Sequence, residues 1–205
     1  MERDLWLYER EYISQGKTLV CGVDEAGRGP LAGPVFAAAV ILPEGLTIEG
    51  LDDSKKLSEK KRGILYDVIC EKSLAYAIAS ASEKEIDDIN ILNASLLAMK
   101  RAVSKLSVSP DVILVDGNKT FETDIHIRSI VKGDSLSANI AAASILAKVS
   151  RDRFMIELAG KYPEYMFEKH KGYPTKLHYE MVEAYGLSDV HRKTFFKKYK
   201  GGILI

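Results

Sequence analysis

The stretch Thr18–Pro34 reads T-L-V-C-G-V-D-E-A-G-R-G-P-L-A-G-P. Its first six residues are mostly apolar or β-branched and predict a strand. Two adjacent acids, Asp24 and Glu25, follow that run, and a loop with three glycines, two prolines and Arg28 comes next. A strand that ends in acidic residues and opens into a glycine-rich loop can support metal-dependent phosphate chemistry. Further acids at neighbouring strand ends would strengthen this interpretation.

Four more strands are expected along the chain. The second, at 35–42, is bounded by two prolines and follows the first after only about ten residues, a link too short for a crossover helix, so the pair must be antiparallel. Alternating or continuous apolar runs predict strands at 74–81, 111–116 and 125–131. The run D-V-I-L-V-D at 111–116 is typical of a central strand buried on both faces.

Helical periodicity separates these strands. Ser58 and the capping-box pair Ser82 and Glu85 mark two helix starts. Helices are expected over 58–71, from 82 to about 106, from 136 to beyond 153, over 176–185, and within 1–16, where Leu5, Trp6 and Tyr8 would pack on the body. This order indicates an α/β fold: a mixed five-stranded sheet flanked by helices, with a small helical C-terminal segment.

Charge is unevenly distributed in this chain of 205 residues. The totals are 29 basic and 29 acidic residues, so no global field attracts nucleic acid. Between Lys169 and Lys200, however, eight basic residues stand against three acidic ones. We therefore expect one integrated domain in which an acidic body at 1–160 is joined to a basic segment at 161–205.

The two cysteines, Cys21 and Cys70, lie far apart and form no C-x-x-C pair. Both are expected to be reduced and to serve as small core residues. The sequence also has no secretory signal and no apolar stretch approaching 18 residues. These features favour a cytoplasmic protein without membrane association.

Four acids are candidates for chemistry: Asp24, Glu25, Asp116 and Asp134. If the first and fourth strands are parallel neighbours, Asp24 and Asp116 end side by side at the edge where α/β sheets collect ligands. An all-oxygen ligand set matches Mg2+ or Mn2+, whereas zinc would want His or Cys. Taken singly, each acid could instead be a helix cap, a turn residue or a solvated charge. This alternative is strongest for Asp134, which stands at the position of a helix N-cap.

The loop Gly27-Arg28-Gly29 allows two interpretations. It is a tight turn that reverses the chain, or a loop that lets the backbone approach a sugar-phosphate with Arg28 as a donor. It matches neither the Walker spacing nor the G-x-G-x-x-G pattern. Nucleoside triphosphate and dinucleotide binding therefore gain no support.

Taken together, five blocks resemble the successive signatures of type 2 ribonuclease H (ribonuclease HII), over about residues 18–196. The blocks are D-E-A-G-R-G-P-L-A-G-P at 24–34, D-S-K-K-L at 53–57, D-G at 116–117, K-G-D at 132–134 with the helix I-A-A-A-S-I-L-A-K at 140–148, and H-K-G-Y at 170–173. The sequence departs from the family pattern at two positions. Lys132 stands where the family often has a glycine, and Pro174 follows the tyrosine where the family commonly has other residues. Pro174 could alter how Tyr173 is presented.

The resemblance implies a ribonuclease H-like fold and cleavage of RNA in RNA–DNA hybrids and at single ribonucleotides embedded in duplex DNA. It places the family's four metal-binding catalytic acids on Asp24, Glu25, Asp116 and Asp134. Gly27, Arg28 and Gly29 would contact the ribonucleotide and its 2'-hydroxyl, and Tyr173 would stack on the sugar on the DNA side of the junction. Without the resemblance, Tyr173 would be a core aromatic beside Pro174. Lys55 resembles a phosphate contact, although lysines before a helix are more often solvated.

The implied mechanism is two-metal hydrolysis by a monomer, with Mg2+ or Mn2+, leaving a 5'-phosphate and a 3'-hydroxyl. One alternative is a non-catalytic nucleic-acid-binding module that kept the fold. Another is type 3 ribonuclease H, which characteristically has an additional N-terminal domain; the 23 residues before Asp24 are too few for one. The sequence leaves open the preferred metal, protein partners, and the roles of residues 1–16 and 201–205.

Overall fold

The centre of the molecule is a five-stranded sheet with the strand order β3-β2-β1-β4-β5. The computed structural model describes residues 4–51, 54, 57–196, 199–200 and 203–204. β2 pairs antiparallel with β1 and with β3, whereas β4 pairs in parallel with β1 and β5, which confirms the predicted mixed sheet. The strands are β1 Val20–Ala26, β2 Val35–Ile41, β3 Ala75–Ala81, β4 Val112–Asp116 and β5 His126–Ile130.

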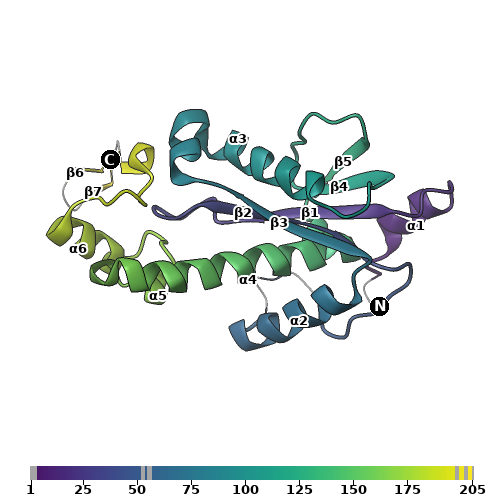
Figure 1. Cartoon of the computed structure of the whole chain (residues 1–205), viewed down its shortest axis with the longest axis horizontal. Coiled ribbons are helices and arrows are strands. Elements are labelled where there is room, and N and C mark those ends of the chain that lie inside the picture. Colours follow the sequence, from purple (N-terminus) through teal and green to yellow (C-terminus); the bar gives the residue numbers. More distant parts are fainter. Residues whose placement is uncertain (1–3, 52–53, 55–56, 197–198, 201–202, 205) are drawn as a thin grey trace.

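Helices cover both faces of the sheet (Figure 1). α3 packs on β1, β2 and β3 from one side, and α4 crosses the other side with α2 alongside it. The helices are α1 Leu7–Ile13, α2 Glu59–Lys72, α3 Glu83–Ser104, α4 Ala138–Lys161, α5 Phe167–His170 and α6 Lys176–Tyr185, with 3-10 turns η2 Gly133–Ser135, η3 Pro163–Tyr165 and η4 Lys193–Phe196.

Small residues let α4 lie close against the sheet. A Cβ added at Gly22 of β1 would lie only 2.1 Å from the main-chain carbon of Asn139, so a side chain has no room there. The three successive alanines of β2, at 37–39, are fully buried. β1 and the start of α4 are thereby fixed against each other, and this contact sets the position of everything that α4 carries.

Capping explains where the helices begin. Ser58 is the N-cap of α2, and Ser82 and Glu85 form the predicted capping box at α3. α3 also contains a break that the periodicity did not predict: Asn90 has φ 67° and ψ 164°. The Asn90 side chain accepts a hydrogen bond from the N–H of Asn93 at 3.1 Å, so it caps the second half of this helix.

The chain ends follow the expectations in part. Leu5 and Trp6 pack against the apolar cluster between α4 and the sheet, as predicted for the N-terminal region. At the other end, β6 Tyr199–Lys200 pairs antiparallel with β7 Ile203–Leu204. The rest of the terminal pentapeptide, at 201–202 and 205, lies outside the described residues.

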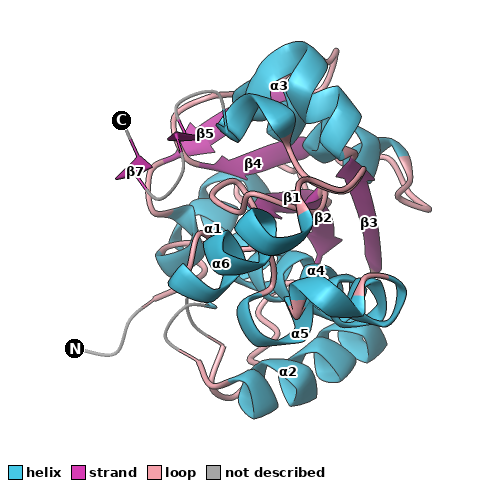
Figure 2. Cartoon of the chain, turned by 90° about the vertical axis from the view of Figure 1, so that its left-hand side faces the viewer, coloured by secondary structure: helices cyan, strands magenta, loops and turns pink. Residues whose placement is uncertain are grey.

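The segment after α4 forms a small helical layer around the C-terminal end of that helix (Figure 2), which confirms the predicted C-terminal segment. Its apolar core includes Tyr165 and Phe167, packed against Met155 of α4. One expectation is wrong here. Arg192 is one of the eight basic residues counted between Lys169 and Lys200, but it adds no charge to the surface of that segment: it is 0% exposed, because its guanidinium donates to carbonyls inside the protein.

The cysteines and the helices give two further results. Cys21 is buried as expected, but Cys70 is only half-buried, because it follows the inward-facing Ile69 on α2 and turns partly towards Tyr66 and Tyr76. None of the helices in the described part of the chain is long and apolar enough to cross a membrane.

Candidate active site

Two parallel strands bring Asp24 and Asp116 together. Val23 of β1 lies beside Val115 of β4, so the acids are the next residues of neighbouring strands, as expected from the sequence. Asp134 approaches from η2, just before α4. One carboxylate oxygen from each of these three acids lies within 4.8 Å of the others. The edge of the sheet therefore holds a compact group of three aspartates.

Glu25 lies beside this group but outside it. The sequence predicted that the first strand ends before the acids, which is wrong. β1 continues to Ala26, because β2 supplies antiparallel partners for residues that lie beyond the pairing with β4. Successive side chains of a strand point to opposite faces, so Asp24 faces α4 and Glu25 faces α3. Arg28 Nη1 donates to Glu25 Oε1 at 3.5 Å.

Asp134 is not the helix cap that its position suggested. Ser137 is the N-cap of α4, and its side chain accepts from the N–H of Ile140 at 3.2 Å. The N–H of Gly133 donates to Asp116 Oδ1 at 2.7 Å, which ties the η2 turn to the end of β4. This turn holds the buried Asp134 close to Asp116.

The environment disfavours negative charge on the acids of β1. Burial, followed by the charges of Glu25 and Asp116, raises the pKa of Asp24 well above its usual value, against hydrogen bonds from Ser144 and the Glu25 N–H. Burial also raises the pKa of Glu25, whereas the positive charge of Arg28 lowers it in part. A cation among these carboxylates would offset both the burial and the mutual repulsion.

The donor chemistry fits a hard divalent cation. The group of three consists of aspartates alone, and none of the described His or Cys residues joins it. Opposite ligands of Mg2+ are about 4 Å apart, since each bond is about 2.1 Å. The observed spread of up to 4.8 Å is slightly wider, so small side-chain movements would close the ligand set.

A cavity of about 270 Å³ adjoins the acids. Ser144 of α4 and Ser54 line it with their hydroxyls 2.8 Å apart, and Lys148 lines it one helical turn further on. Sequence reasoning did not single out these three as site residues. Ser144 did carry a signal, since it is the only polar residue in the apolar run at 140–147 of α4.

Gly27, Arg28 and Gly29, which we call the reading loop, form the other wall of this cavity together with Tyr173. Gly27 has φ 104°, a conformation that favours glycine, and Arg28 keeps about half of its side chain exposed. A Cβ on Gly29 would lie 3.9 Å from Cε1 of Tyr173, which is 38% exposed and therefore not a core aromatic. Lys55 lies outside the described residues.

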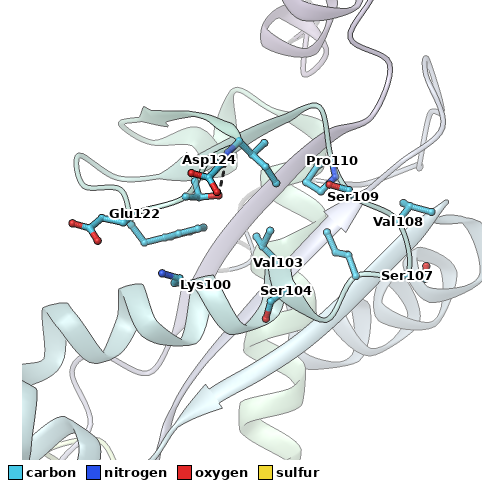
Figure 3. Close-up of a pocket in the computed structure, with 13 residues that line it drawn as sticks. Lys100, Val103, Ser104, Ser107, Val108, Ser109, Pro110, Glu122 and Asp124 are labelled. Carbon is cyan, nitrogen blue, oxygen red and sulfur yellow. Dashed lines mark hydrogen bonds between the residues drawn. The ribbon is translucent and has the colours of Figure 1, made fainter.

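A larger cavity lies elsewhere. It measures about 660 Å³ and lies between the end of α3 and the segment that leads into β5 (Figure 3). Lys100, Glu122 and Asp124 line it, together with several serines and apolar side chains. It contains none of the residues that the sequence places at the site.

Comparison with known proteins agrees with this geometry. The sequence profile of the family described as ribonuclease HII matches residues 21–199. The chain belongs to the ribonuclease HII family. A ribonuclease HII of Caldicellulosiruptor bescii is 53% identical over 189 residues, which cover 92% of each chain. A ribonuclease HII of Dechloromonas aromatica is 57% identical over 177 residues, covering 86% of this chain and 90% of that one.

The fold agrees as well. The crystal structure of the ribonuclease H2 from Pyrococcus horikoshii matches with a TM-score of 0.71 at 29% identity, covering 85% of this chain and 92% of that one. Ribonuclease HII enzymes are metal-dependent hydrolases that cleave the RNA strand of RNA–DNA hybrids. The resemblance inferred from the sequence blocks is therefore confirmed. The chain belongs to the type 2 family and not to the type 3 ribonuclease H family considered as an alternative.

Proposed function

We propose that this protein incises duplex DNA at single embedded ribonucleotides, in addition to cleaving RNA in RNA–DNA hybrids, by hydrolysis assisted by two Mg2+ or Mn2+ ions. The observation that carries the proposal is that Asp24, one member of the three-aspartate group, lines the same cavity as the loop 27–29. Asp24 and Glu25 precede the loop in the same turn of chain, and Asp116 and Asp134 join Asp24 from β4 and η2, so a nucleotide recognised by the loop would have its phosphate next to these acids.

Asp24, Glu25, Asp116 and Asp134 would hold the ions. When bound, such ions activate water and stabilise the leaving 3' oxygen. The protein's own contribution is orientation: Gly133 fixes Asp116 through a 2.7 Å hydrogen bond, and Ser144 hydrogen-bonds Asp24. The products would carry 5'-phosphate and 3'-hydroxyl ends.

Recognition of one ribonucleotide requires direct contact with its 2'-hydroxyl, the chemical mark that separates it from DNA. The main chain of Gly27–Gly29 and the half-exposed Arg28 would supply donors for the sugar and its phosphates. Tyr173 would stack on the neighbouring sugar, and its exposed ring faces the same cavity. Lys55 remains a proposed phosphate contact on its sequence motif alone.

The segment 161–205 would bind the duplex as part of the same domain, using exposed lysines such as Lys169 and Lys193. We propose a monomer, since one chain supplies both acids and reading loop. A cytoplasmic location is supported by two free cysteines, as expected in a reducing compartment.

The test is a cleavage assay with the purified protein on three matched duplexes: DNA with one ribonucleotide, an RNA–DNA hybrid and all-DNA. We expect Mg2+- or Mn2+-dependent cleavage of the first two, with a single incision beside the ribonucleotide, and no cleavage of the third. Product ends are identified by ligation and by phosphatase treatment. Cleavage of the hybrid alone would refute the ribonucleotide proposal, and binding without any cleavage would favour the non-catalytic alternative.

A further inference from the structure

Arg192 lies buried beneath the reading loop and donates to three main-chain carbonyls. Its Nη2 donates to the carbonyl of Gly27 at 2.7 Å, its Nη1 to that of Arg28 at 3.1 Å and its Nε to that of Gly33 at 2.9 Å. Burial, followed by the nearby charge of Arg151, lowers the pKa of Arg192 to about 9, so the group is still protonated at pH 7. Charge-assisted hydrogen bonds of this kind are stronger than neutral ones.

These bonds determine which way the loop's peptide groups face. In a trans peptide the C=O and the following N–H point in opposite directions, and every peptide in the described structure is trans. With the carbonyls of Gly27 and Arg28 drawn in towards Arg192, the N–H groups of Arg28 and Gly29 face away from it. Arg28 and Gly29 line the 270 Å³ cavity, so these two donors are available to a sugar or phosphate there.

A second chain of hydrogen bonds starts at the preceding residue, His191. The N–H of Ser188 donates to His191 Nδ1 at 3.0 Å, which assigns the ring proton to Nε2. His191 Nε2 lies 3.1 Å from His178 Nε2, and His178 Nδ1 lies 3.0 Å from the carbonyl oxygen of Tyr173. One set of neutral tautomers satisfies every contact, with each ring donating towards Tyr173.

The neutral state of these rings is consistent with their surroundings. Both imidazoles are at most 1% exposed, and burial lowers the pKa of His178 and of His191 to about 4. His170 stacks on His178 with ring centroids 4.4 Å apart, and its pKa is also lowered by burial. The chain of donors therefore persists at pH 7.

The main chain joins these two sets of hydrogen bonds, which we call the Arg192 arm (Arg192 to the reading loop) and the His191 arm (His191 through His178 to Tyr173). The N–H of Arg192 donates to the carbonyl of Leu31 at 2.8 Å, and the N–H of Leu31 donates to the carbonyl of Gly172 at 2.8 Å. His191 forms a β-bridge with Ala32. Main-chain hydrogen bonds thus connect the His191–Arg192 pair and Gly172, the residue before Tyr173, to Leu31 and Ala32, which follow the reading loop.

We propose that His191 and Arg192 are positioning residues that set the gap between the reading loop and Tyr173, and so determine selectivity for a ribonucleotide. Arg192 acts through the carbonyls of Gly27 and Arg28, and His191 acts through His178 on the main chain of Tyr173. Neither residue touches the metal-binding acids. This inference rests on the proposed function of the loop and of Tyr173.

The test of the Arg192 arm compares Arg192→Gln with Arg128→Gln, an arginine on β5 that pairs with Glu11 far from the loop. Affinities for a duplex with one ribonucleotide and for the same all-DNA duplex are measured by fluorescence anisotropy without divalent metal. We expect Arg192→Gln to reduce the preference for the ribonucleotide at least fivefold, with all-DNA affinity changed less than twofold. A proportional loss on both duplexes would mean a merely structural role and would overturn the proposal.

Folding is checked by titrating Mn2+ alone into each variant by calorimetry, since intact acids should bind it as in the wild type. If Arg192→Gln does not fold, Arg192→Lys is used, which keeps the charge but cannot reach three carbonyls, and the same loss of preference is expected. An unchanged preference in the folded variant would also overturn the proposal.

The His191 arm is tested by a double-mutant cycle with Tyr173→Ala. We expect His191→Leu to lower kcat/KM on the single-ribonucleotide duplex about tenfold in the wild type and less than twofold in the Tyr173→Ala background. His191→Gln, which keeps a donor towards His178, should lose less than His191→Leu. Equal losses in both backgrounds would overturn this arm. If the wild type itself neither prefers nor cleaves the ribonucleotide duplex, the proposed function fails and the inference with it.

Discussion

Replacing Asp24 by asparagine is expected to stabilise the metal-free protein while it abolishes cleavage. In the folded chain this carboxylate is 5% exposed and shares the edge of the sheet with Asp116 and Asp134, whose oxygens lie within 4.8 Å. Asparagine has the same shape and its Oδ1 can keep the 2.7 Å hydrogen bond from the N–H of Glu25. The substitution therefore removes charge with little change in packing.

The size of the effect follows from the distances. Two unit charges 4.8 Å apart repel by about 3.5 kcal/mol at an effective dielectric constant of about 20. Burial, followed by the charges of Glu25 and Asp116, raises the pKa of Asp24, so the ionised form is disfavoured and the full repulsion is an upper limit for the gain. We expect the free energy of unfolding to rise by about 2 kcal/mol, which corresponds to a Tm increase of about 4 to 8 °C for a chain of this size.

The assay is thermal unfolding followed by circular dichroism, in EDTA and in Mn2+, with the exposed Asp189→Asn as the matched control. Saturating Mn2+ at a hundred times Kd should stabilise the wild type by about 2.7 kcal/mol, and Asp24→Asn by much less. The control should differ from the wild type by less than about 0.5 kcal/mol in both conditions. A lower Tm for Asp24→Asn in EDTA, or a full response to Mn2+, would refute the electrostatic reasoning.

Three further outcomes are expected. Asp116→Asn should lower cleavage at least about a hundredfold, because metal-ion catalysis contributes several kcal/mol, while duplex affinity stays within about twofold; substantial turnover would exclude a role as ligand. Tyr173→Ala should lower kcat/KM at a single ribonucleotide by about 1 to 3 kcal/mol of lost stacking, and Tyr173→Phe, which keeps the ring, should lose much less; equal losses would argue against stacking. Between about pH 4 and 6.5 the unfolded chain binds protons that the buried His178 and His191 do not, so stability should rise with pH by up to roughly 3 kcal/mol for each ring. Urea unfolding of the wild type and of His178→Gln measures this as a difference, in which the opposite contribution of the buried acids cancels; identical slopes would contradict it.

Much of the sheet edge could be predicted from the sequence. The short link after β1 required an antiparallel β2, and the apolar run before Asp116 indicated a central strand, so Asp24 and Asp116 had to meet if β1 and β4 were parallel neighbours. The end of β1 could not be placed, because Glu25 and Ala26 remain in the strand only through pairing with β2. That partner is known only once the sheet has formed.

Arg192 shows the other limit of prediction. In the sequence it belongs to a basic stretch and looks solvated, whereas in the structure it is buried beneath a loop more than 150 positions earlier in the chain. Its burial depends on the carbonyls of Gly27, Arg28 and Gly33, which are distant in the chain and cannot be inferred from the sequence around Arg192. Asn90 is similar: asparagine adopts a positive φ more readily than most residues, but nothing in the periodicity around it required a break there.

The alternation of β1 has a consequence for how this enzyme can be redesigned. Because Asp24 faces α4 and Glu25 faces α3, each acid is held by a different helical layer. A small hollow of about 80 Å³ on the α3 side is lined by Ser95, Leu96 and Met99 of α3 together with Glu25 and Asp116, but not by Asp24. Substitutions of these α3 residues can alter the surroundings of Glu25 and Asp116 while the contact of α4 with Asp24 stays intact, so the two sides of the site are open to separate adjustment.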